Sequence, residues 1–167
     1  MTPLTRVRVW LAVFVIGLVV SGITAFPLEW ESRLLADLVH AGWSPAPAVT
    51  AWVDRIHEAI VRTNRQYPFL AYGTDWLAFA HLVIAVAFWG PLRDPVRNVW
   101  VVKFGMIACA GVVPLALIAG AARGIPWWWQ AIDISFGLVG IVPLLFAWAG
   151  IRRLDGRTRL PPSAADV

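Results

Sequence analysis

Four ionisable side chains stand inside long apolar stretches of the sequence: Asp75, His81, Lys103 and Asp133. A charged group within a bilayer costs several kcal/mol, so a residue of this kind needs a structural or functional reason. An Asp and a His together can pass a proton, act as acid and base, or bind a ligand. Asp75, His81 and Asp133 are therefore the first residues to consider for chemistry.

Asp133 and His81 are the central pair of this hypothesis. His81 lies about 9 Å deeper than Asp75 if the segment is helical, at 1.5 Å per residue. Asp133 would need a hydrogen-bond donor or a cation, and the sequence offers His81 at similar depth or Arg123 in the preceding turn. We take as the candidate intramembrane polar site His81, Asp133, Asp75 and Arg123.

Each of these residues also has a purely structural explanation. Thr74 could be the N-cap of a helix whose dipole Asp75 complements. His81 shares a stripe with small or polar residues, so it could form a hydrogen bond across a helix bundle. Asp133 could tie helices together in the same way, and Lys103 can extend to the headgroups. The catalytic residues, if there are any, stay unknown at this stage.

Cofactor and metal chemistry find little support in the sequence. Cys109 is the single cysteine, so an intrachain disulfide is excluded. The three histidines are scattered, and no CxxC, HExxH, GxGxxG or Walker A pattern occurs. We predict no metal site and no cofactor. A haem would need His81 with a second chain, or with His40 or His57.

The composition indicates a membrane protein. Of the 167 residues 59% are hydrophobic and 14% charged, against about 45–50% and about 25% in soluble domains. The net charge of +4 comes from arginines at the ends of apolar runs, which argues against nucleic acid as a partner. Eleven Trp suit the headgroup level of a bilayer.

Four apolar runs are long enough to cross a hydrocarbon core of about 30 Å. They cover residues 9–26, 72–90, 99–120 and 127–150 within one membrane domain, 1–150. The first run is longer than the usual signal-peptide core, so we favour an uncleaved helix over cleavage near residue 25. Turns are predicted at 90–95 and 123–126. The polar tail, 151–167, is expected to be largely disordered.

Residues 27–70 differ from the rest in carrying five acids and four arginines. Apolar residues recur there at helical spacing, which predicts amphipathic helices over about 28–41 and 48–64. The first puts Trp30, Leu34, Leu35 and Leu38 on one face. The sequence SPAP at 44–47 separates the two helices.

The arginines predict the orientation, because short positive loops stay in the cytoplasm. We therefore expect both termini and the 91–98 turn in the cytoplasm and the 27–70 segment outside. The predicted cytoplasmic arginines are Arg6, Arg8, Arg93, Arg97, Arg152, Arg153, Arg157 and Arg159.

Small residues suggest where helices approach one another closely in lipid. Gly17, Ser21 and Thr24 form one stripe on the first run. Two pairs on the third run are spaced i,i+4, namely Gly105 with Cys109 and Ala116 with Gly120.

Three strings in the chain resemble a family of small bacterial four-helix membrane proteins. They are YGTDWLAFAH at 72–81, GPLRDP at 90–95 and IDISFG at 132–137. The resemblance covers roughly residues 67–150. It implies a membrane protein and no particular activity.

These observations predict an all-α fold, an integral membrane four-helix bundle with two short amphipathic helices in the first extracytoplasmic segment. The expected localisation is a bacterial inner membrane. The lipid bilayer is the expected partner, and a homodimer or a membrane-protein partner is left open. The first hypothesis is a structural or accessory role, and an enzyme is less favoured. The alternatives are a small transporter subunit with a proton-linked His/Asp pair, and a membrane enzyme or haem-binding subunit acting on an apolar substrate.

Overall fold

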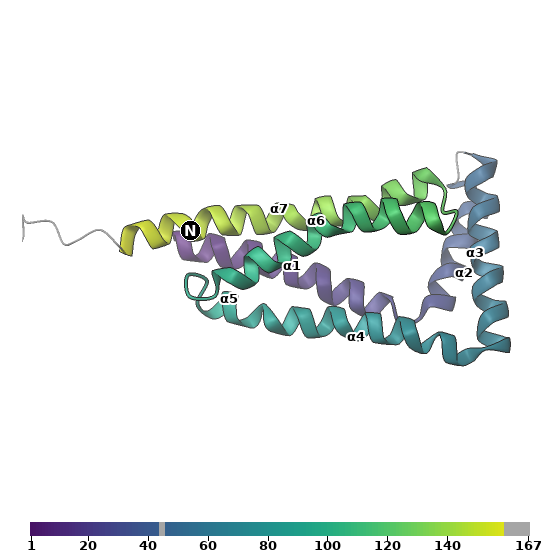
Figure 1. Cartoon of the computed structure of the whole chain (residues 1–167), viewed down its shortest axis with the longest axis horizontal. Helices are drawn as coiled ribbons and strands as arrows, with labels where there is room; N and C mark the ends of the chain where they lie inside the picture. The colour runs from purple at the N-terminus through teal and green to yellow at the C-terminus, as the bar shows by residue number, and fades with distance from the viewer. Residues whose placement is uncertain (44–45, 159–167) are drawn as a thin grey trace, which may run out of the picture. The chain divides into compact units, whose positions relative to one another are not determined.

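The computed structural model describes residues 1–43 and 46–158, and within these ranges the chain forms helices and turns but no strand (Figure 1). Four helical stretches are long and apolar enough to cross a membrane, the same number as the apolar runs predicted from the sequence. They are Pro3–Thr24, Pro68–Arg93, Val99–Ala122 and Trp127–Gly156. The elements are α1 (Pro3–Thr24), α2 (Leu28–Leu38), η1 (Val39–Trp43), α3 (Pro47–Gln66), η2 (Pro68–Leu70), α4 (Tyr72–Ala87), α5 (Trp89–Arg93), α6 (Val99–Ala122) and α7 (Trp127–Thr158).

The chain divides into two compact units, and α1 and α4 contribute to both of them. Unit 1 comprises Met1–Gly17 and Ala85–Val167. Unit 2 comprises Leu18–Ile84.

Unit 1 is built on the hairpin of α6 and α7, against which the first half of α1 packs (Figure 1). Glycines allow the close approach. A Cβ on Gly137 would lie 2.5 Å from the carbonyl oxygen of Cys109, and one on Gly150 would lie 2.5 Å from Val7 Cγ2. Gly105 and Gly120 lie at contacts of the same kind, as predicted for the third run. The fully buried side chains of this unit include Val7, Leu11, Phe88, Val102 and Leu144.

The turn between α6 and α7 has the geometry that a glycine requires. Gly124 has a φ of 67°, in the left-handed region that other residues rarely adopt. The amide of Ile125 donates to the carbonyl of Gly120 at 2.9 Å, which closes the helix end in a Schellman arrangement. The predicted turn at 123–126 is confirmed.

The turn between α4 and α6 is less tight than predicted, because it contains the short helix α5. Asp94 accepts a hydrogen bond from the amide of Arg97 at 3.0 Å, and the Asn98 side chain donates to the carbonyls of Gly90 and Asp94. Arg8 of α1 donates to the carbonyls of Leu92 and Arg93, both at 2.9 Å.

These contacts place the arginine-rich segments together. Arg8 joins the start of α1 to the 91–98 turn, and the Val7–Gly150 contact joins it to the last part of α7. The three segments that the arginines predict to share one side of the membrane therefore lie at one end of unit 1.

The helix α7 extends further than expected. It runs without interruption to Thr158, so residues 152–158 are helical where we predicted disorder. Residues 159–167 lie outside the described part. Pro143 stands inside α7, and its ring leaves the carbonyl of Val139 without the usual helical donor.

Unit 2 brings the second half of α1 against α4. A Cβ on Gly22 would lie 3.0 Å from the carbonyl oxygen of Ala78 and 3.1 Å from His81 Cβ. The predicted small stripe of α1 is wrong, because Gly17, Ser21 and Thr24 are all exposed and a Cβ on Gly17 would meet nothing within 4 Å. The stripe predicted on α4 does face another helix, since Ala78 is fully buried.

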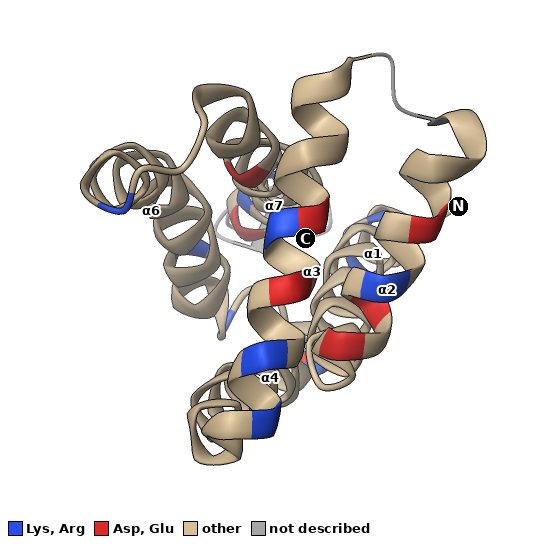
Figure 2. Ribbon diagram, turned by 90° about the vertical axis from the view of Figure 1, so that its right-hand side faces the viewer, with Lys and Arg blue, Asp and Glu red and all other residues tan. Residues whose placement is uncertain are grey.

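The predicted amphipathic helices form a hairpin of α2 and α3, on which many of the charged residues of the chain lie (Figure 2). Polar side chains link the two helices. Ser32 Oγ lies 2.9 Å from His57 Nδ1, His40 Nε2 lies 2.9 Å from Asp54 Oδ1, and Asn64 donates to Glu29 at 2.9 Å. The predicted break at 44–47 falls partly on residues 44 and 45, which are outside the described residues.

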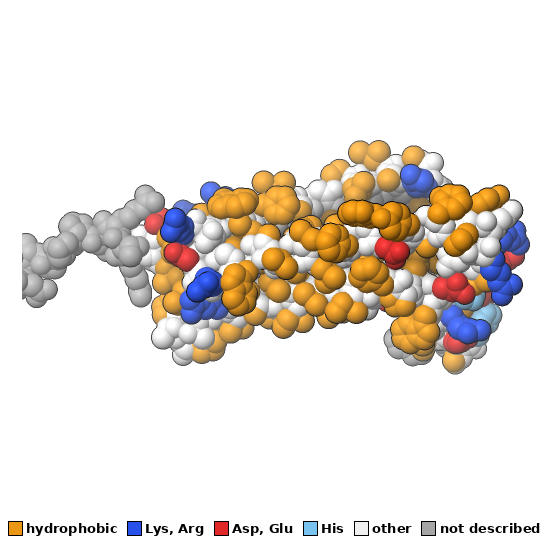
Figure 3. Space-filling view, turned by 90° about the horizontal axis from the view of Figure 1, so that it is seen from below, with side chains coloured by type: hydrophobic (Ala, Val, Ile, Leu, Met, Phe, Trp, Pro, Cys, Tyr) orange, Lys and Arg blue, Asp and Glu red, His pale blue; other side chains and the backbone are white. Residues whose placement is uncertain are grey.

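Large hydrophobic side chains point outward along the long helices, as the space-filling view also shows (Figure 3). Ile107, Ile118 and Val139 each expose more than two thirds of their surface. Such exposure on otherwise apolar helices is what a lipid environment accommodates.

Candidate functional site

Asp133 lies in the second turn of α7, half-buried within unit 1. Its position follows from the sequence, because Pro126 precedes the helix and Trp127, six residues before Asp133, is the first helical residue. The carboxylate has no hydrogen-bond or ionic partner among the described residues of its unit. An acid of this kind, in a helix long and apolar enough to cross a membrane, is a candidate functional residue.

Arg123 does not neutralise Asp133, although we considered it as a partner. It is the C-cap residue of α6, and its side chain is exposed. The two ion pairs found within residues 1–43 and 46–158 are His40–Asp54 and Glu58–Arg62, both in unit 2. The predicted contact of Asp133 with a cation in the preceding turn is therefore not formed.

His81 belongs to unit 2 and is half-buried on α4. Its Nδ1 lies 2.8 Å from the carbonyl oxygen of Leu77, one turn earlier in the same helix. A carbonyl can only accept, so the proton is on Nδ1 and Nε2 remains available to bind a proton or a ligand. Nδ1 therefore bonds within its own helix and does not form the structural alternative, a hydrogen bond across the bundle. The pairing of His81 with Asp133 stays a prediction.

Asp75 stands in the first turn of α4, as predicted, but Thr74 is not its N-cap. The helix begins at Tyr72, directly after the 3-10 turn η2, so Thr74 is already helical. Its hydroxyl donates back to the carbonyl of Ala71 at 2.6 Å. The sequence could not reveal this, because Pro68 starts a helical turn earlier than the apolar run does.

Lys103 is exposed on α6 and lines a hollow of about 330 Å³. Arg152 lines the same hollow and lies over the ring of Trp148, 5.1 Å from its centroid. This position near the arginine-rich end agrees with a lysine that extends to the headgroups.

No three metal-ligating side chains of the His, Cys, Asp or Glu type come together in residues 1–43 and 46–158. The two outer histidines are engaged within the α2–α3 hairpin, His57 by Ser32 and His40 by Asp54. Within one chain the haem hypothesis needs one of them beside His81, and each already forms a hydrogen bond through one ring nitrogen.

Sequence reasoning missed three residues that organise unit 1. Gln130 donates to the carbonyl of Ile125 at 2.7 Å and fills the space over Gly120, so it secures the α6–α7 turn. Arg8 binds two carbonyls of the α5 turn. Trp10 stacks on Phe146 with ring centroids 4.7 Å apart. Only Arg8 had a signal, its position at the end of an apolar run.

No protein-family model, curated protein or solved structure matches this chain. The resemblance of the three strings to small bacterial membrane proteins therefore stays a prediction.

Proposed function

We propose that the chain is a multi-pass protein of a bacterial inner membrane with a structural or accessory role, and that its α2–α3 hairpin lies on the extracytoplasmic surface of the bilayer. The observation that carries this proposal is the distribution of side chains on the hairpin. Polar residues occupy the contact between the two helices, while an apolar ridge on α2 faces outward. The ridge consists of Trp30, Leu34, Leu35 and Leu38.

The contact between α2 and α3 supports this arrangement. Ser32 is buried there and bonded to His57, and Ala36 and Val53 fill the space beside it. Trp30, by contrast, exposes 62% of its surface and Leu34 exposes 45%. The hairpin thus holds together through its own bonds and leaves its largest apolar side chains outside.

An apolar ridge beside charged residues is the pattern of helices that lie in the membrane interface. Such helices bury their apolar face about 5–10 Å into the boundary between headgroups and acyl chains. The exposed face of α3 carries charges instead, including Arg55, Glu58, Arg62 and Arg65. The hairpin has one face suited to lipid and one suited to water.

A depth measurement tests this proposal. Single cysteines at Leu34 and Arg62, in a Cys109→Ser background, receive nitroxide labels in bilayer nanodiscs. We expect the label at position 34 to be relaxed by oxygen and the label at position 62 by a water-soluble nickel chelate. Equal access of the nickel chelate to both positions would reject the interfacial hairpin. If carbonate washing releases the chain from membranes, the proposal that it is an integral membrane protein is rejected.

One observation favours a second candidate, a proton-linked transporter subunit: the carboxylate of Asp133 has no partner among the described residues of its unit. Reconstituted vesicles should then show pH-dependent uptake that is lost in Asp133→Asn. Uptake that does not depend on pH, or that survives the substitution, would remove this candidate. Mass spectrometry and absorption spectra of whatever copurifies would separate the accessory, transport and haem hypotheses.

A further inference from the structure

A groove between α1 and α7 lies at the arginine-rich end of unit 1, outside the candidate polar site. Its volume is about 420 Å³, within the roughly 300–1,000 Å³ range of small-molecule sites. Residues from the first turns of α1 form one wall, and residues 146–154 of α7 form the other. The two helices approach closely beside the groove, where Gly150 meets Val7.

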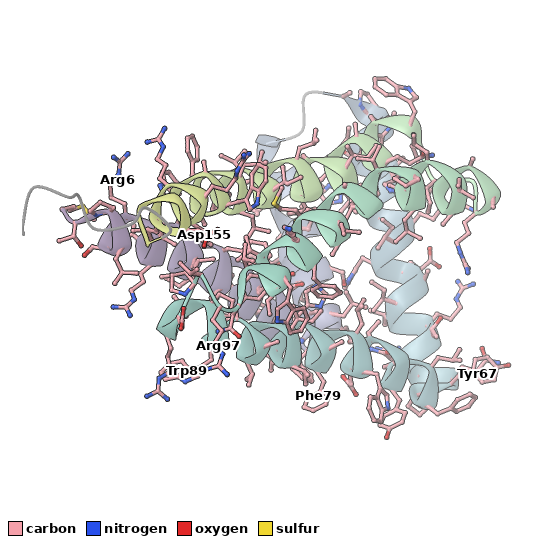
Figure 4. The ribbon with its side chains drawn as sticks, turned by 60° about the vertical axis from the view of Figure 1, so that its left-hand side comes forward. Arg6, Tyr67, Phe79, Trp89, Arg97 and Asp155 are labelled. Atoms are coloured by element: carbon pink, nitrogen blue, oxygen red, sulfur yellow. The ribbon has the colours of Figure 1, made fainter. Side chains whose placement is uncertain are left out.

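The mouth of this groove is positive. Arg6 comes from α1 and Arg153 from α7, both exposed, and Arg6 projects away from its helix (Figure 4). No acidic side chain lines the groove among the described residues. The hollow around Lys103 differs in this respect, because Asp155 lines it together with Arg152.

The floor of the groove is aromatic. Trp10 and Phe146 stack with ring centroids 4.7 Å apart and an angle of 20° between the planes. Phe146 still exposes 54% of its surface, so the pair offers a flat apolar face rather than filling a closed core. A ligand that suits both the positive mouth and the aromatic floor of the groove carries an anion at one end and hydrocarbon at the other.

We propose that this groove binds one anionic phospholipid, with its phosphate between Arg6 and Arg153 and an acyl chain against Trp10 and Phe146. The inference goes beyond the proposed function and rests only on its premise that the helices span a bilayer. Guanidinium groups suit phosphate because they offer paired donors in one plane. The charge of the groove excludes the zwitterionic lipids as preferred occupants, since nothing in it would balance their ammonium group.

Native mass spectrometry of delipidated protein in detergent micelles tests the proposal. The protein is titrated with phosphatidylglycerol and with phosphatidylcholine of identical acyl chains. We expect one phosphatidylglycerol to bind at least about tenfold more tightly than phosphatidylcholine, because two arginines near the membrane surface attract an anionic headgroup. Equal affinity for the two lipids would overturn the proposal.

Two double variants locate the site. Arg6→Gln/Arg153→Gln should remove the preference for phosphatidylglycerol. Arg93→Gln/Arg97→Gln takes the same charge from the same end of the unit, outside the groove, and should keep it. A preference that survives in the groove variant, or that both variants lose equally, would overturn the assignment. All four arginines are exposed, and thermal unfolding verifies that each variant is folded.

Two further arms identify the ligand. Phe146→Ser keeps the charge and should weaken the binding of both lipids about equally. Inorganic phosphate in millimolar excess should not displace phosphatidylglycerol, and displacement would mean that the groove takes free phosphate instead. Carbonate extraction is scored separately, so a failure of membrane insertion is distinguishable from a failure of lipid selectivity.

Discussion

At Gly137 the backbone of α7 comes so close to α6 that a Cβ would lie 2.5 Å from the carbonyl oxygen of Cys109 and 3.0 Å from the Cβ of Val112. Neither neighbour is the end of a flexible side chain, so neither can move aside easily. Lipid is as apolar as the helix faces, and packing of this kind is what remains to hold such helices together.

Gly137→Ala should therefore lower the free energy of unfolding by about 1–3 kcal/mol, the usual effect of overfilling a packed contact. Gly111→Ala is the matched control in α6, since a Cβ there meets nothing within 4 Å. Removing that glycine should leave stability unchanged or raise it by up to about 1 kcal/mol. Unfolding in mixed micelles, followed by circular dichroism, measures both, and equal effects would contradict the packing argument.

Asp133 gives a second prediction at the same scale. Asp133 has no partner among the described residues of its unit, and a half-buried carboxylate without a partner costs free energy, so Asp133→Leu should raise the free energy of unfolding by about 1 kcal/mol. Asp37→Leu, at an exposed position on α2, should change it by less than about 0.5 kcal/mol. Unfolding in mixed micelles, followed by circular dichroism, measures both variants. A marked loss of stability in Asp133→Leu would mean that the carboxylate has a partner, as the His81 hypothesis requires.

The sequence could predict which residues are costly in a membrane, but not their partners. Asp75 and Asp133 stand out because the residues around them are apolar. The failure at Gly17 has a simple cause: a small residue facing lipid and a small residue facing a helix look alike in the sequence. Gly22, which does contact α4, lies outside the predicted stripe.

Among the elements, the α2–α3 hairpin shows how an amphipathic pattern is realised. The periodicity predicted both helices, and the structure places Ser32, His57 and Asn64 in the contact between them. The hydrogen-bond partners could not be predicted, because helical spacing determines on which face of its helix a residue lies but not which residues of the neighbouring helix lie opposite it. Glu29, for example, bonds to Asn64, which lies far from it in the sequence.

Ser32→Ala should weaken the hairpin more than His40→Ala. Ser32 is buried, so its loss leaves His57 Nδ1 without that partner and costs about 1–3 kcal/mol. The His40–Asp54 pair is largely exposed, with 60% and 46% of the two side chains accessible, and such pairs contribute about 0–1 kcal/mol. Amide hydrogen exchange across α2 and α3 measures the difference, and equal protection in the two variants would be inconsistent with it.

The end of α7 shows where composition misleads. Residues 152–158 are polar, which suggested disorder, yet they continue the helix. Arginine and leucine are good helix formers, and no proline lies between Pro143 and Pro161. A preceding helix also removes the cost of nucleation, so a polar extension needs little help to remain helical.

At the scale of the whole molecule, the distribution of the arginines in the sequence agrees with the contacts within unit 1. The start of α1, the 91–98 turn and the last part of α7 lie at one end of the unit. Four spans with both termini on one side satisfy this arrangement. The orientation across a membrane stays a prediction from the arginines, whose charge asymmetry acts on short loops directly and without tertiary contacts.

Cysteine labelling should confirm this topology. In a Cys109→Ser background, Asp37→Cys should react with a membrane-impermeant maleimide added to spheroplasts. Arg97→Cys and Asp155→Cys should react only after the membrane is permeabilised. Reaction of all three from outside, or of Arg97→Cys and Asp155→Cys in opposite compartments, would contradict four spans with both ends in the cytoplasm.

The discontinuity of unit 1 has a consequence for biosynthesis. Val7 finds its place against Gly150, yet about 140 residues must be translated between them. At roughly 5–20 residues per second, the ribosome needs on the order of 10 s to supply the missing surface. During that time α1 lacks its contacts with α7, so unit 1 is complete only after α7, its last helix in the sequence, has been made.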